Sequence, residues 1–164
     1  MKLRYLSIIA AVALVAACES APKANNTAGA GSTNNGTMTP ATPSVALGSQ
    51  ADFVANVGDR IFFAYDKSDV SADARGTLDK WVAFLKKYPN DKLTVEGHCD
   101  ERGTVEYNLA LGDRRATAVK NYLVAQGVDV GRLKTISYGK SRPAVMGHDE
   151  AAWAQNRRGV GVIQ

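Results

Sequence analysis

The stretch from residue 93 to 124 constrains the fold more than any other part of this chain, because its periodicity changes from that of a strand to that of a helix within a few residues. Apolar and polar residues alternate over 93–98, which predicts a strand with one apolar face. Asp100-Glu101-Arg102-Gly103 then breaks the pattern with turn-forming residues, and Thr104 is a suitable helix cap. The stretch therefore predicts a strand, a polar turn and a helix in direct succession.

The helix expected after this turn has a thin apolar side and ends at Gln126-Gly127. Its inward positions follow helical spacing and are Gly112, Ala116, Val119 and Leu123. Asp100 is expected where the strand ends, and Arg115 a turn or two into the helix. We therefore expect a carboxylate and a guanidinium to face one cleft.

Further strand and helix patterns flank this stretch. Strands are expected over 60–65, 133–138 and 160–163, the first of them buried. A helix capped by Ser71 is expected to bury Leu78, Trp81, Val82 and Leu85 and to stop at Pro89-Asn90, and a short helix to run from Asp149 through Ala154. The order βαβαβ(α)β predicts an α/β sandwich of the α+β type, a mixed sheet with helices packed on one face.

The first 17 residues have the layout of an export signal. Lys2 and Arg4 form a basic start, and residues 6–17 form an apolar run that is too short to span a bilayer. Small residues precede Cys18, as in a bacterial lipobox, so we expect cleavage before Cys18, lipidation of this residue and, because Glu19 follows it, transfer to the outer membrane. The alternative is an ordinary signal peptide with an unmodified cysteine.

Composition divides the remaining chain into a linker, 18–50, and one domain, 51–164. The linker is rich in Ala, Asn, Thr, Gly, Ser and Pro, which predicts a segment without a packed core. The net charge of the 164 residues is +4, and without Lys2 and Arg4 there are 18 basic against 16 acidic residues. This near-balance gives no support for nucleic-acid binding.

Two other clusters of charged residues resemble a metal site and a nucleic-acid-binding patch, but the sequence favours neither. A metal site at residues 98–101 is not expected, because consecutive strand residues point to opposite faces and cannot converge on one ion. Arg114, Arg115, Arg157 and Arg158 lack interleaved aromatic residues, so we expect solvated or carboxylate-paired arginines. No cofactor is expected.

Two segments, TVEGHCDERGTVEYNLALGDRRATAV at 94–119 and SYGKSRPAVMGHDEAAWAQNRR at 137–158, closely resemble the OmpA C-terminal-like domain family. With the lipobox and linker, the resemblance covers essentially the whole mature chain. It implies a domain that binds peptidoglycan stem peptides non-covalently. It also implies an outer-membrane lipoprotein whose domain faces the periplasm, with TolB and other Tol-Pal components as partners in envelope integrity and cell division.

The same resemblance implies which residues bind the ligand. Asp100 and Arg115 match the family's pair for diaminopimelate, a group that presents an ammonium and a carboxylate on one carbon. The residues alone favour structural roles instead, in which Asp100 caps the turn and Arg115 forms a surface ion pair. Asn108 would touch the ligand or orient the loop, and Leu111 would share the helix face of Arg115.

Tyr65 and Asp66, after the first strand, match another family segment at the site, although Tyr65 also fits an ordinary core position. The chain departs from the expected pattern at Ala64 and Cys99, neither of which removes a ligand-binding group. The alternative function is a cell-wall hydrolase that uses His98, Asp100 or Glu101. No nucleophile with a positioned base is apparent in the sequence, so we expect no catalytic residue and no enzyme.

Overall fold

The computed structural model describes residues 45–164, so the expected signal peptide and Cys18 lie outside the described residues, as does most of the expected linker. The elements in chain order are α1 (Gln50–Asn56), β1 (Arg60–Phe62), α2 (Ala72–Lys87), β2 (Leu93–His98), α3 (Val105–Ala125), the 3-10 helix η1 (Val130–Arg132), β3 (Leu133–Gly139), α4 (Glu150–Asn156) and β4 (Arg158–Ile163). No helix within 45–164 is both long and apolar enough to cross a membrane.

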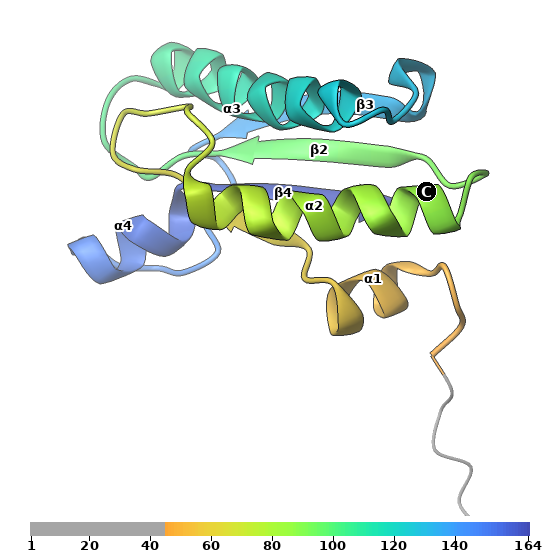
Figure 1. The fold of residues 1–164 in the computed structure, drawn as a ribbon. Coiled ribbons are helices and arrows are strands. Elements are labelled where there is room, and N and C mark those ends of the chain that lie inside the picture. Colours follow the sequence, from red (N-terminus) through yellow and green to blue (C-terminus); the bar gives the residue numbers. More distant parts are fainter. Residues whose placement is uncertain (1–44) are drawn as a thin grey trace, which may run out of the picture. The chain divides into compact units, whose positions relative to one another are not determined.

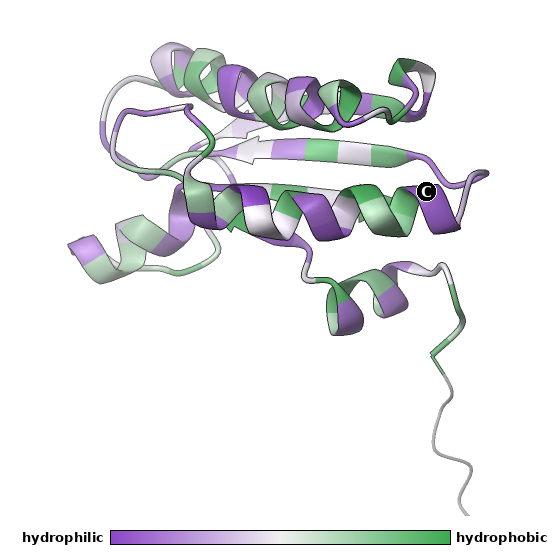
Figure 2. Ribbon diagram, in the orientation of Figure 1, coloured by the Kyte–Doolittle hydropathy of each residue, from purple (hydrophilic) through white to green (hydrophobic). Residues whose placement is uncertain are grey.

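The four strands form one mixed sheet in the order β1-β4-β2-β3, which confirms the predicted fold class. Strand β4, the last in sequence, lies antiparallel between β1 and β2, whereas β2 and β3 are parallel. Helices α2 and α3 run along the same face of this sheet (Figure 1). Both helices carry hydrophilic and hydrophobic residues, as expected for helices with one buried side (Figure 2).

The predicted apolar stripes form the core. The apolar stripe of α3 is buried. The four expected residues of α2 are buried as well, and Trp81 is the largest of them. Ser71 and Asp149 cap α2 and α4 through their side-chain oxygens, as predicted. Trp81 also donates its indole N–H to the carbonyl of Gly58 over 2.7 Å, so its one polar atom is satisfied.

The largest differences from the sequence expectations are at α1 and β1. Helix α1 was not predicted, because only Phe53 anchors it in the core, against Trp81 and Phe84, and a single buried aromatic residue creates no helical period. The expected buried strand over 60–65 is wrong in length and burial. It ends at Phe62 and forms a sheet edge, with Ile61 buried and both neighbours exposed.

A close approach of α3 to β2 sets the position of the residues that follow the strand. A Cβ atom on Gly97 would lie 1.8 Å from the carbonyl oxygen of Gly112, and one on Gly112 would lie 2.3 Å from Ser137 Oγ. Only glycine fits at this crossing. The first half of α3 therefore lies directly against the end of β2.

Candidate functional site

The site is built where β2 ends and α3 begins. After His98 the chain turns through residues 99–103, and Thr104 accepts a hydrogen bond from the backbone N–H of Tyr107, which confirms the predicted helix cap. Gly103 has a φ of 91°, a backbone conformation that residues other than glycine rarely adopt. The turn is therefore short and tightly specified.

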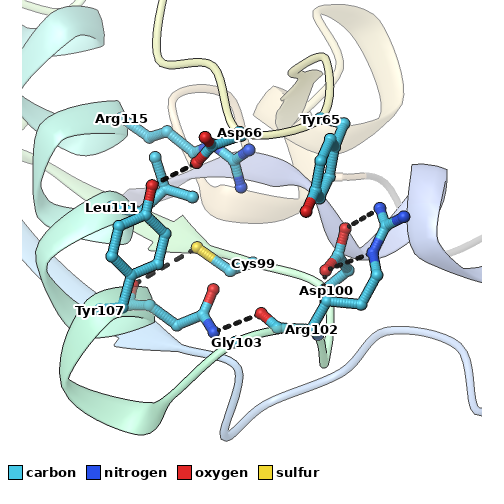
Figure 3. Close-up of a pocket in the computed structure, with 10 residues that line it drawn as sticks. Tyr65, Asp66, Cys99, Asp100, Arg102, Gly103, Tyr107, Leu111 and Arg115 are labelled. Atoms are coloured by element: carbon cyan, nitrogen blue, oxygen red, sulfur yellow. Dashed lines mark hydrogen bonds and ion pairs between the residues drawn. The ribbon is translucent and has the colours of Figure 1, made fainter.

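A cavity of about 190 Å³ lies between this turn, the first half of α3 and the segment after β1 (Figure 3). Its lining comprises Tyr65, Asp66, Cys99, Asp100, Arg102, Gly103, Tyr107, Asn108, Leu111 and Arg115. All six residues that were expected to bind ligand are among them. The structure thus brings the predicted set together, while their role in binding stays a prediction.

Arg115 is fully buried and lies nearly three turns into α3, farther than the one or two expected. Its guanidinium donates to three backbone carbonyls, from Nε to Lys67 over 2.9 Å, from Nη1 to His98 over 2.8 Å and from Nη2 to Ala64 over 3.2 Å. The alternative of a surface ion pair is therefore wrong. Three of the five N–H groups of an arginine are used in this way, which leaves two for a ligand.

Burial lowers the pKa of Arg115, but a guanidinium stays charged at neutral pH. The carbonyls that hold it come from the end of β2 (His98) and from the loop after β1 (Ala64 and Lys67). Since these carbonyls carry only partial charges, Arg115 presents a dry positive charge to the cavity.

Asp100 is also buried, and arginines surround it. Arg102 binds it in a bidentate fork, from Nη2 to Oδ2 over 2.6 Å and from Nε to Oδ1 over 3.2 Å, and Arg157 Nη1 lies 3.4 Å from Oδ2. Burial by itself raises the pKa of Asp100, but these hydrogen bonds and charges outweigh it and hold the pKa below its usual value. Asp100 is therefore an anion in the folded protein.

Asp100 also accepts a hydrogen bond from the backbone N–H of Arg102 over 3.1 Å. It therefore caps the turn, which is the structural role predicted as its alternative. Asp100 and Arg115 form no direct ion pair within residues 45–164. They line the same cavity at separate positions, as Figure 3 shows. Two opposite charges thus line one cavity.

The other predicted residues have clear structural roles. Asn108 donates its amide to the carbonyls of Arg102 and Thr104 over 2.8 and 2.9 Å, so it orients the loop, one of the two roles expected for it. Leu111 is buried one turn before Arg115, as expected. Tyr65 is exposed, so the reading as an ordinary core residue is wrong.

Asp66 has a φ of 53° and accepts a hydrogen bond from the hydroxyl of Tyr107. This bond is the main cause of a raised pKa for Tyr107. The contact joins the loop after β1 to α3 and forms one side of the cavity (Figure 3).

The sequence did not predict that Arg102 and Arg157 surround Asp100. Arg157 was, however, among the arginines expected to be solvated or paired with carboxylates, and it does pair with Asp100 and Glu150. Arg102 lies between the rings of Tyr65 and Trp153, with its guanidinium carbon 4.0 Å from each ring centre. Arg157 is 57 positions from Asp100 in the sequence. Only the return of β4 to the centre of the sheet brings α4 and Arg157 here, and no local pattern indicates this.

Neither His98 nor Cys99 forms a metal-binding group with its neighbours. The His98 ring packs on the ring of Tyr138, with 5.4 Å between centroids, whereas the Cys99 thiol donates to the carbonyl of Asn108 over 3.4 Å. Burial raises the pKa of the Cys99 thiol. Within 45–164 no group of three or more His, Cys, Asp or Glu side chains is arranged to hold a metal ion.

Known proteins resemble this chain over most of its length. The model of the OmpA family matches residues 62–157. A peptidoglycan-associated lipoprotein of Agrobacterium fabrum is 49% identical over 98% of this chain and 88% of the relative. A protein of the same name from Rhizobium meliloti is 57% identical over 71% of this chain and 66% of the relative.

Among solved structures, the peptidoglycan-associated lipoprotein of Burkholderia pseudomallei is 42% identical, with a TM-score of 0.63 over 65% of this chain and 90% of that one. The fold, the family model and the identity over almost the entire sequence thus agree. The chain belongs to the OmpA family, and its relatives there are peptidoglycan-associated lipoproteins.

Proposed function

We propose that this protein binds peptidoglycan through its cavity, which takes the free end of a meso-diaminopimelate residue in a stem peptide. The observation that carries this proposal is a buried carboxylate and a buried guanidinium, Asp100 and Arg115, in one cavity without a direct contact between them. The names of the relatives support an association with peptidoglycan.

The charges of the site match this ligand. The two unused N–H groups of Arg115 would bind the ligand carboxylate, and Asp100 would bind its ammonium. The cavity, with a volume of about 190 Å³, is small, which suits the head of one amino acid rather than a larger group. The remainder of the stem peptide would lie outside.

The rest of the chain turns this binding into a tether. We infer that Cys18 carries lipid in the outer membrane, that the linker spans part of the periplasm and that the domain holds the cell wall. Two attachments on one chain raise the effective concentration of each, so the link persists although each contact is reversible. As part of the Tol-Pal system, the domain would also bind TolB and other components, in support of envelope integrity and cell division.

In this proposal the protein acts by binding and not by catalysis. A general acid must hold a proton near neutral pH, whereas the arginines keep Asp100 ionised. Arg115, with its guanidinium bound to three carbonyls, is a fixed cation and cannot exchange protons at that pH. The release of soluble fragments from cell walls by the purified protein would contradict this view.

Co-sedimentation of the full-length protein, in mild detergent, with insoluble peptidoglycan tests the proposed site. We expect Asp100→Ala and Arg115→Lys to lose most of the binding, by about 2 kcal/mol or more, since each removes or misplaces a charge-assisted hydrogen bond. Arg115→Lys keeps the positive charge but lacks the planar guanidinium with its forked N–H donors.

Asp113→Ala and Arg114→Lys are matched controls, because they make the same two substitutions at exposed positions of α3. Thermal unfolding of every variant separates loss of binding from loss of fold. If Asp100→Ala and Asp113→Ala sediment alike while folded, the site assignment is wrong.

A further inference from the structure

The carboxylate of Asp100 has no lone pair left to accept a further hydrogen bond. A carboxylate offers about four lone-pair sites. Oδ1 accepts from the backbone N–H and Nε of Arg102, and Oδ2 accepts from Arg102 Nη2 and Arg157 Nη1. A ligand ammonium therefore reaches Asp100 only if one of these donors leaves.

Of the two guanidinium groups, that of Arg102 is the one free to leave. The side chain of Arg157 is 8% exposed and also holds the carbonyl of Phe63 over 3.1 Å and Glu150 Oε1 over 2.6 Å. The side chain of Arg102 is 29% exposed, and every hydrogen bond that its guanidinium donates goes to Asp100. Its other contacts are the faces of two aromatic rings, which tolerate sliding, and a long ion pair with the exposed side chain of Glu150.

We propose that Arg102 is a built-in competitor of the ligand, an internal cation that occupies Asp100 in the free protein and is displaced by the ligand's ammonium. This inference rests on the function proposed above. It means that binding exchanges one cation for another instead of adding a new ion pair, so the affinity of the site stays low and the attachment reversible.

The structure also offers a place for the displaced side chain. Glu150 Oε2 lies 3.8 Å from Arg102 Nη1, and the Glu150 side chain is 64% exposed. Moving toward Glu150 keeps the guanidinium near the ring of Trp153, which lies in the same helix, α4. Arg102 can thus exchange a buried carboxylate for an exposed one without losing all of its contacts.

Calorimetric titration of the full-length protein, in mild detergent, with the tripeptide L-Ala-γ-D-Glu-meso-diaminopimelate tests this exchange. The matched ligand is the same tripeptide with the free amine of diaminopimelate acetylated. We expect Arg102→Ala to bind the amine ligand about three- to tenfold more tightly than the wild type and the acetylated ligand no more tightly. Arg102→Lys should fall between, because a lysine still competes but has no fork.

Glu150→Gln gives an independent test, because it removes the acceptor for the displaced side chain. We expect it to weaken binding of the amine ligand more in the wild type than in the Arg102→Ala background. The Arg114→Ala variant removes the same charge outside the cavity and should bind both ligands as the wild type does.

Three results would overturn the inference. If Arg102→Ala binds the amine ligand less tightly or equally, Arg102 is a ligand contact or a bystander. If the acetylated ligand gains as much as the amine ligand, Arg102 only blocks space. If the wild type and Asp100→Ala bind the amine ligand alike, the proposed function itself fails. The comparison of Arg102 variants cannot give this result, so the two failures are distinguishable.

Discussion

The apolar core under α2 and α3 and the charged cavity at the end of β2 both bury large side chains, but they hold them differently. Around Trp81 the partners are other apolar side chains, and almost any group of the right size and polarity contributes. Around Asp100 and Arg115 each partner is one specific donor or acceptor.

The difference follows from the cost of burial. An apolar side chain gains about 1.5–3 kcal/mol on leaving water, whereas a buried charge without partners costs far more. The core therefore stabilises the fold, whereas the cavity lowers the stability because it keeps two opposite charges out of water. Substitutions in the two regions should accordingly change different measurements.

The largest expected effect is on stability, in the core. Trp81→Ala should lower the free energy of unfolding by about 3–5 kcal/mol, because it leaves a cavity between α2 and the sheet and removes the bond to Gly58. Chemical denaturation measures this loss, and Met146→Ala, at an exposed position, is the control. A loss below 1 kcal/mol would mean that the core does not depend on this residue.

An intermediate effect is expected on the pH dependence of stability. Burial, followed by the charges of Arg158, Arg142 and Arg60, lowers the pKa of His98 to about 4. The unfolded chain therefore binds more protons than the folded one between about pH 4 and 6.5, so stability falls as the pH drops through this window. Each unit of pKa difference corresponds to about 1.4 kcal/mol.

His98→Gln should remove this component, since glutamine does not titrate. The measurement is the free energy of unfolding from pH 7 down to pH 4 in both proteins. Carboxylates that titrate in this range are common to both, so the difference between the two curves isolates His98. Parallel curves would show that His98 is not a buried neutral group.

The smallest effect is expected at the junction of the two regions. Thr104→Ala removes the cap of α3 and should cost about 1 kcal/mol. The first turn of α3 carries Asn108, which orients the loop around Asp100, so peptidoglycan binding should also weaken slightly. Thr104→Ser keeps the hydroxyl and should behave as the wild type in both measurements.

Local patterns predicted much of the fold and of the site. The stripes of α2 and α3 and the caps Ser71 and Thr104 are correct, because helical spacing and capping depend on residues close together in the chain. The expected binding residues lie after β1, after β2 and in the first three turns of α3, and the structure places them in one cavity.

The sequence by itself thus determined the central strand and the two long helices and, together with the family resemblance, pointed to six of the ten residues that line the cavity. Only the tertiary structure decided what those residues contact. Strand β4 inserts between β1 and β2, and this insertion carries Arg157 to Asp100. Arg115 finds its carbonyls at the end of β2 and in the loop after β1. Contacts between residues far apart in the chain depend on strand order and loop closure, which no local period encodes.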